Sequence, residues 1–220
     1  MDRYVICAYR PWNLEFFKGK PIISRPQDLE VKLASYKPKW VFFLDWSWII
    51  PEKIIKKYKC VCFHEADLPN FRGGSPIQNQ IVRGIKKTKL TAFLMDKGLD
   101  TGDILLQEDL SLEGHIYEIF TRVTHTTSHM INRILNGDYT IKKQKGKGSC
   151  YKRRKPEDSE IKDFGTIGWE ELYDKIRMLE DPYPNAFINL GDKQIVFKTV
   201  NWELEGGIFD RKLVATVEIV

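Results

Sequence analysis

The sequence predicts an α/β fold in which helices cover both faces of a mostly parallel sheet and a small β-rich appendage follows. Short, almost purely apolar runs such as residues 40–44 are typical of central strands buried on both faces. Segments with apolar residues at helical spacing separate these runs, and residues 115–135 form the longest of them. The last residues alternate between polar and apolar types, which indicates short strands.

Prolines set two element boundaries in the first half of the chain. Pro38 ends a helix, and Pro51 begins another, where its missing N–H would have no partner in any case. Residues 9–13 break the first strand. The expected strands are residues 4–8, 21–24 and 40–44, and the expected helices are residues 27–36 and 52–58.

The second half continues the alternation of strands and helices, and Asn136 and Gly137 end its long helix. We expect residues 1–150 to form the core domain. Residues 151–220 are expected to form a C-terminal helix and a small β appendage packed on that core. The expected strands are residues 59–63, 90–95 and 104–110, and the expected helices are residues 77–82, 115–135 and 169–179.

Length and composition fit one globular domain with a small appendage. The 220 residues are 42% hydrophobic and 12% aromatic, which excludes a disordered chain. No run approaches the roughly 18 apolar residues that a membrane helix needs, and the first ten residues lack the apolar region of a signal peptide. We therefore expect a cytoplasmic protein without a membrane partner, and the oligomeric state stays open.

The cysteines and histidines do not predict a metal site. Cys60 and Cys62 form a C-x-C pair, but no further ligands stand at a suitable spacing. His125 and His129 share a helix face without a third ligand. We expect no metal.

The net charge of +5 is concentrated in one segment. Residues 142–155 contain eight lysines and arginines and no acidic residue. Such a segment is either a solvated loop or a site for an anion, which could be a phosphate, a pyrophosphate or a nucleic-acid backbone. The composition leaves these alternatives open.

Two polar residues stand at the ends of expected strands. His64 follows the apolar run 59–63 and precedes a turn rich in proline and glycine, residues 68–76. Asp100 lies in a polar loop after the run 90–95. Ligands of parallel α/β sheets bind outside the carboxyl ends of the strands, where we expect both residues to lie.

The stretch HEADLPNFRGGSPIQNQI and the later GLDTGDIL together resemble the folate-dependent formyltransferase family. That family includes enzymes acting on aminoacyl-tRNA, on glycinamide ribonucleotide and on nucleotide sugars. The resemblance implies a Rossmann-like sheet of the formyltransferase type. The matched positions, in order, are His64, Leu68, Pro69, Arg72, Gly73, Leu99, Asp100, Thr101 and Gly102.

The resemblance implies direct transfer of a formyl group from 10-formyltetrahydrofolate to an amine, with His64 and Asp100 as catalytic residues. A histidine exchanges protons near neutral pH, and a neighbouring carboxylate fixes its tautomer. The family's asparagine two positions before the histidine is replaced by Cys62, whose thiol is a weak donor. We expect Asn79 to stabilise the oxyanion instead. Gln78, a backbone N–H and protonated His64 are alternatives.

Further site residues follow from the same resemblance and from the expected loops. The residues expected to bind the cofactor are Trp48, Ile49, Arg72, Met95, Asp96, Gly98 and Leu99. The residues expected to bind the substrate are Tyr9, Arg10, Gly73, Gly74, Gln78, Lys152, Arg153 and Arg154.

The expected substrate is a nucleotide-linked, UDP-type aminosugar, as in the pseudaminic-acid pathway, with no nucleic acid as a partner. Two segments, YKRRKPED and DPYPNAF, resemble the nucleotide-sugar enzymes. We expect too few residues to remain for the larger C-terminal domain of the aminoacyl-tRNA enzymes. The alternatives are a non-catalytic folate or nucleotide binding module, a formyltransferase for another amine such as aminoacyl-tRNA, and a nucleic-acid-binding protein that uses residues 142–155.

Overall fold

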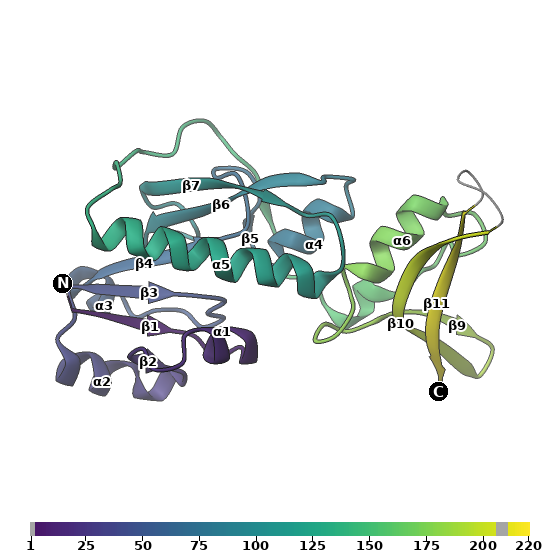
Figure 1. The fold of residues 1–220 in the computed structure, drawn as a ribbon, viewed down its shortest axis with the longest axis horizontal. Coiled ribbons are helices and arrows are strands. Elements are labelled where there is room, and N and C mark those ends of the chain that lie inside the picture. Colours follow the sequence, from purple (N-terminus) through teal and green to yellow (C-terminus); the bar gives the residue numbers. More distant parts are fainter. Residues whose placement is uncertain (1–2, 206–210) are drawn as a thin grey trace.

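The computed structural model describes residues 3–205 and 211–220. Figure 1 shows two parts, a larger core that contains the N-terminus and a smaller part around the C-terminal strands. No helix within the described ranges is long and apolar enough to cross a membrane.

The core is built on a six-stranded sheet with the order β2-β1-β3-β4-β6-β7. Strands β2, β1, β3 and β4 run parallel, whereas β6 is antiparallel to both of its neighbours. The expectation of a mostly parallel sheet is therefore confirmed. The strands are β1 (Tyr4–Cys7), β2 (Ile22–Ile23), β3 (Trp40–Phe43), β4 (Lys59–His64), β6 (Lys87–Leu94) and β7 (Ile104–Ser111).

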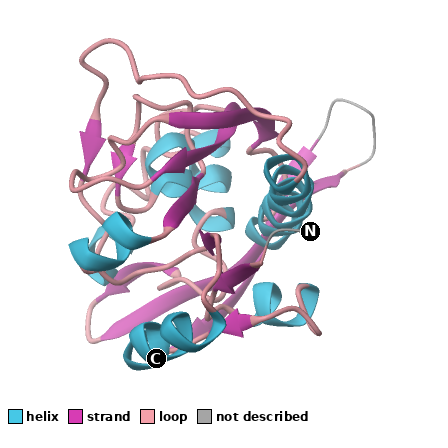
Figure 2. Cartoon of the chain, turned by 90° about the vertical axis from the view of Figure 1, so that its left-hand side faces the viewer, coloured by secondary structure: helices cyan, strands magenta, loops and turns pink. Residues whose placement is uncertain are grey.

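Helices cover both faces of this sheet, as expected (Figure 2). On one face, residues such as Phe42 and Val61 pack with the long helix α5. On the other face, Val41 and Phe43 pack with α2 and α3. This alternation buries β3 on both sides. The α-helices are α1 (Pro11–Phe16), α2 (Leu29–Tyr36), α3 (Glu52–Lys57), α4 (Pro76–Ile81), α5 (Ile116–Leu135) and α6 (Trp169–Arg177), and two 3₁₀ helices are η1 (Pro26–Asp28) and η2 (Pro156–Ser159).

Helix α1, which begins within the residues 9–13 that break the first strand, was not among the expected helices. Pro11 occupies its first turn, where a missing N–H costs nothing. The ring of Trp12 stacks on Phe120 of α5 with centroids 4.4 Å apart, which fixes the helix on the core.

The C-terminal part is an antiparallel sheet with α6 against it, which confirms the expected β appendage. Its order is β11-β10-β9, with β9 (Ala186–Leu190), β10 (Lys193–Leu204) and β11 (Arg211–Ile219). Residues of this part, among them Leu179 and Phe197, belong to the same apolar cluster as α5. The two-residue strand β5 (Arg72–Gly73) pairs with β8 (Cys150–Tyr151). This pairing joins the chain at the expected domain boundary to the core.

The position of Asp100 differs from its expected place at the carboxyl end of a parallel strand. Because β6 is antiparallel to β4, its last residue, Leu94, lies opposite Val61 near the start of β4. The loop that follows returns to the end of β4, where His64 lies 3.8 Å from Asp100.

Candidate functional site

The site is organised around His64, the last residue of β4. Its side chain is 7% exposed. The ring Nε2 lies 2.7 Å from the carbonyl oxygen of Phe71, and since a carbonyl can only accept, Nε2 carries the proton in this contact. Nδ1 lies 3.8 Å from Oδ2 of Asp100. The structure thus brings together the two predicted catalytic side chains, and their roles stay predictions.

Asp100 is held from both sides. Its Oδ2 accepts a hydrogen bond of 2.8 Å from the N–H of Gly73. The Gln144 side chain donates to the carbonyl oxygens of Asp100 and Gly102, at 2.8 and 2.9 Å. The loop after β6 begins near the start of β4, at the opposite end of that strand from His64. These contacts explain how it holds the Asp100 carboxylate beside His64.

Backbone strain gathers at the same place. Five described residues other than glycine have positive φ, and four of them, Asp45, Phe71, Ser75 and Asp100, lie in the loops around His64. Such conformations cost roughly 1–3 kcal/mol each and cluster at functional sites. The strain marks these loops as the candidate site independently of the sequence motif.

Sequence reasoning missed two carboxyl groups beside His64. Asp45, which follows β3, accepts hydrogen bonds from Trp12 Nε1 at 3.1 Å and from Asn13 Nδ2 at 2.7 Å. Glu65 follows His64 directly and is 9% exposed. Burial and then the nearby Asp45 charge raise the pKa of Glu65 to about 8, and burial also raises the pKa of Asp45. The position of each acidic residue just after a buried strand was the sequence feature that could have identified both carboxyl groups.

We expect Glu65→Gln to stabilise the fold increasingly as pH rises. Glu65 has a pKa of about 8 in the folded state against 4.5 ordinarily, so the folded state binds more protons between these values. The wild-type unfolding free energy therefore falls from about pH 5 to pH 8. The gain should approach a few kcal/mol at pH 8, at about 1.4 kcal/mol per pKa unit. Melting temperatures measured across this range test it.

Glu113→Gln is the matched control for this variant, because Glu113 is exposed. Its melting curve should follow that of the wild type at every pH. A Glu65→Gln curve that also runs parallel to the wild type would show that Glu65 is ionised in the folded protein.

The groups expected to replace the family asparagine are engaged elsewhere. Asn79 Nδ2 donates to the carbonyl oxygens of Gly74, at 2.9 Å, and Lys152, at 3.3 Å. Gln78 Nε2 donates to the carbonyl of Met178 at 3.4 Å. The Asn79 amide therefore joins two loops near the site, the Gln78 amide joins α4 to the end of α6, and this geometry does not favour Asn79 as the oxyanion donor.

Cys62 keeps its thiol neutral. Burial raises the pKa of Cys62 well above its usual value, and the charges of Asp100 and Glu65 raise it further. Its Sγ lies 3.7 Å from the Phe63 carbonyl. A thiolate nucleophile is therefore disfavoured.

The basic residues 152–154 pack against the glycine turn that precedes α4. A Cβ on Gly74 would lie 2.5 Å from the Cα of Arg153, so only glycine allows this approach. The Arg153 side chain reaches Ser47 Oγ at 3.4 Å, and Lys152 is exposed. Arg154 donates to the carbonyl of Asp158, which gives its side chain a structural role.

Aromatic side chains from two loops meet beside these arginines. Tyr9 hydrogen-bonds Ser47 at 2.8 Å, and its ring lies 4.6 Å from that of Trp48. The guanidinium of Arg10 lies 4.9 Å from the Tyr9 ring. The structure therefore brings Tyr9, Arg10 and Trp48 together, and their roles in binding stay predictions.

The predicted cofactor residues divide into two groups. Trp48, Ile49 and Leu99 present exposed apolar surface, and Ile49 is 97% exposed. The others have partners within the chain. Arg72 donates to Gln144 Oε1, Asp96 accepts from the Gly98 N–H and from Thr101 Oγ1, and the Met95 N–H donates to the Cys60 carbonyl.

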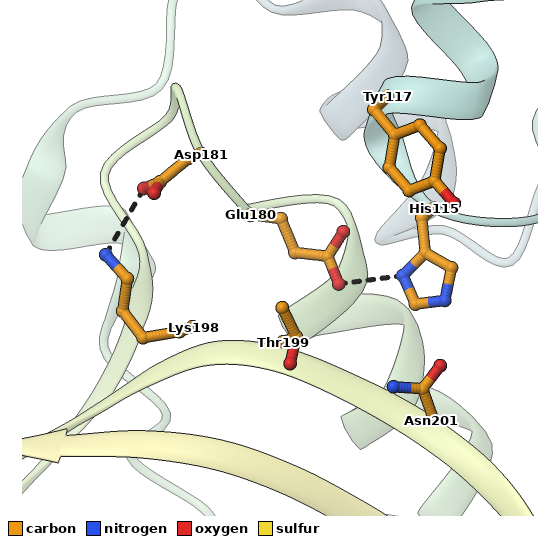
Figure 3. A pocket seen from close by; sticks show the side chains of 7 residues that line it. All are labelled: His115, Tyr117, Glu180, Asp181, Lys198, Thr199 and Asn201. Carbon is orange, nitrogen blue, oxygen red and sulfur yellow. Dashed lines mark hydrogen bonds and ion pairs between the residues drawn. The ribbon is translucent and has the colours of Figure 1, made fainter.

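A separate hollow of about 380 Å³ lies between the start of α5 and β10. His115 Nδ1 lies 2.8 Å from Glu180 Oε1 there, and Lys198 pairs with Asp181 at 3.3 Å (Figure 3). None of the predicted site residues lines it. Within residues 3–205 and 211–220, no group of three or more acidic, histidine or cysteine side chains could hold a metal ion.

Two family models match the chain. The model described as formyl transferase matches residues 14–134. The model described as the C-terminal domain of methionyl-tRNA formyltransferase matches residues 156–220.

Relatives and solved structures agree with these matches. A methionyl-tRNA formyltransferase of Rickettsia prowazekii is 36% identical over 70% of this chain and 52% of its own length. The chain thus spans about half the length of the curated relatives that head the comparison. The structure of a methionyl-tRNA formyltransferase from Clostridium thermocellum is 39% identical, with a TM-score of 0.89 over 100% of this chain and 99% of that chain.

These findings correct the expected substrate. The formyltransferase PseJ from Anoxybacillus kamchatkensis, solved with a UDP-linked formamido sugar and tetrahydrofolate, is 21% identical over 76% of this chain and 93% of its own, with a TM-score of 0.56. That likeness extends to the fold alone. The expectation of a nucleotide-linked aminosugar is wrong, because residues 156–220 match the C-terminal domain of methionyl-tRNA formyltransferase. The expectation that no nucleic acid takes part was drawn from the sugar interpretation and is wrong with it.

Proposed function

Because the chain belongs to the formyl transferase family, we propose that it transfers a formyl group from 10-formyltetrahydrofolate to the α-amino group of methionyl-tRNA. One observation carries the choice of amine. Similarity to a methionyl-tRNA formyltransferase covers the whole chain at 39% identity and includes the C-terminal sheet.

Residues in the loops that follow β3 and β6 suit a folate donor. Trp48, Ile49 and Leu99 offer exposed apolar surface for a flat ring. Trp46 Nε1 is buried and has no hydrogen-bond partner among the described residues, so it is available to an acceptor on a ligand. When bound, the donor supplies the formyl carbon that the amine attacks.

His64 and Asp100 perform the proton chemistry in this proposal. The attacking nitrogen loses a proton to His64 as its bond to the formyl carbon forms. The bond between that carbon and the donor nitrogen then breaks, and the proton passes from His64 to that nitrogen, so that tetrahydrofolate leaves. Asp100, 3.8 Å from Nδ1, stabilises the resulting imidazolium. For this step the His64 ring must carry its own proton on Nδ1, facing Asp100, so that Nε2 leaves the Phe71 carbonyl and accepts the proton from the substrate.

The test is an assay with 10-formyltetrahydrofolate and methionyl-tRNA, in which formyl-methionyl-tRNA should form at a rate that depends on the enzyme concentration. Uncharged tRNA is the matched control, because it carries the same phosphates without the amine. If folate binds and methionyl-tRNA stays unmodified, the proposed substrate is wrong.

Neutralising Lys152 and Arg153 together is expected to raise KM for methionyl-tRNA about tenfold with kcat retained. Both side chains are exposed, and contacts to phosphate act equally in the ground and transition states. Two fewer phosphate contacts should also lower the slope of log KM against log salt by roughly 1.5–2. The measurement is steady-state kinetics at several salt concentrations.

Lys18→Ala with Lys20→Ala serves as the control, since these lysines are exposed after α1. Their removal should leave KM unchanged. Equal KM values for the Lys152 and Arg153 variant and the wild type would show that this segment is a solvated loop without a role in substrate binding.

A further inference from the structure

The strand β11 is an unpaired edge of the C-terminal sheet. Within the described part of the chain it pairs only with β10, and none of its nine residues is buried. A long edge strand with free backbone groups is a template for pairing with another strand. Natural proteins protect such edges with prolines, bulges or charged side chains. The sequence RKLVATVEI contains no proline, and its two basic residues, Arg211 and Lys212, lie at one end of the strand.

The direction of each backbone group on β11 follows from one pair. The residue after the strand, Val220, exchanges both hydrogen bonds with Gln194, at 2.7 and 2.9 Å. The register shift between β10 and β11 inserts an extra residue, Lys198, into β10, so β11 itself alternates without interruption. Even-numbered residues of β11 therefore face β10, and the N–H and C=O groups of residues 211, 213, 215, 217 and 219 face outward.

We propose that two copies of this chain form a dimer in which β11 pairs with β11, antiparallel and centred on Ala215. Each outward-facing N–H and C=O group of β11 then lies opposite a partner group on the second copy. Ala215 lies opposite Ala215 of the second copy, Leu213 lies opposite Val217, and Arg211 lies opposite Ile219. The two three-stranded sheets become one six-stranded sheet.

The side chains are self-complementary in this register. On the face toward the apolar core, Leu213 and Ala215 continue into Val217, which is 42% exposed in the single chain. Pairing extends this row with the same residues of the second copy. On the opposite face Lys212, whose Nζ lies 3.3 Å from Glu205 of its own chain, also lies opposite Glu218 of the second copy, and symmetry repeats this pair of opposite charges.

Other registers fit less well. A centre at Val217 places Thr216 opposite Glu218 and leaves Lys212 beyond the paired region. A centre at Leu213 pairs Lys212 with Val214 and leaves residues 216–219 unpaired. Of these three registers, only the centre at Ala215 pairs all nine residues and places Lys212 opposite Glu218.

The test is the mass in solution of the full chain, measured by sedimentation over a range of concentrations. The wild type should be a dimer at the higher concentrations. Lys212→Glu places like charges opposite each other twice, which should raise the dissociation constant about tenfold. Glu218→Lys should do the same, and the double variant should restore the wild-type value.

Ala215→Pro provides a test that does not depend on charge. Its N–H faces outward, so proline should spare the pairing with β10 and block the second copy. The melting temperature of each variant checks folding, and Lys193→Glu is the control for charge reversal elsewhere on the sheet. A wild type that is monomeric throughout, or a dimer that neither Ala215→Pro nor Lys212→Glu weakens, would overturn the proposal.

Discussion

Replacing His64 with alanine is expected to lower kcat for formyl transfer by about 10²–10⁴-fold, the range for a placed proton acceptor. The side chain is 7% exposed and lies between Asp100 and the carbonyl of Phe71, so its ring is held in one place by contacts on both nitrogens. Folate affinity should stay within a few-fold of the wild type. Single-turnover rates and a separate folate titration give the two quantities.

His125→Ala is the matched control for this substitution. His125 is an exposed histidine on α5 whose ring contacts Phe16, with centroids 4.8 Å apart. Its removal should leave kcat unchanged. A His64→Ala enzyme with wild-type kcat would exclude His64 as the proton acceptor, whereas a wild type without turnover would support a non-catalytic binding module.

The elements of the fold could be predicted because their patterns are local. The apolar run of β3 and the helical spacing of α5 each lie within one segment and reappear in the structure. Strand direction is not local. An apolar run looks the same in either direction, so the antiparallel β6, and with it the return of the loop to Asp100, could not be predicted.

The candidate site divides in the same way. His64 and Asp100 stand in linear motifs, and the structure brings them together. The partner of Arg72 is Gln144, 72 positions further along the chain, and no spacing rule connects them. Asp45 and Glu65 become neighbours only through the parallel pairing of β3 and β4. Contacts of this kind depend on the folded chain, which is why these residues were assigned other roles or none.

The substrate prediction failed for another reason. The length remaining after residue 150 suggested that an aminoacyl-tRNA enzyme was excluded, although residues 156–220 match the C-terminal domain of methionyl-tRNA formyltransferase. Length was a weaker indicator than the pattern of α6 and the three strands that follow it.

Asp100→Asn is expected to lower kcat by up to about 10⁴-fold, the loss known for an aspartate that fixes a catalytic histidine. The change removes charge with little effect on shape. Asparagine tolerates the φ of 54° at this position, and its side-chain oxygen still accepts from the Gly73 N–H. The melting temperature should therefore stay near that of the wild type, while kcat falls across the pH range.

The double variant decides whether the two residues act as one unit. If Asp100 acts only through the ring of His64, adding Asp100→Asn to His64→Ala should cost almost nothing more, because the group that it stabilises is already gone. Additive losses would instead mean that Asp100 contacts the substrate or the donor directly. Its carboxylate lies 3.8 Å from Nδ1, beyond a hydrogen bond, so the coupling must tighten when substrate binds. The coupling free energy between the two substitutions that is calculated from kcat should accordingly exceed the coupling that is calculated from their effects on thermal stability.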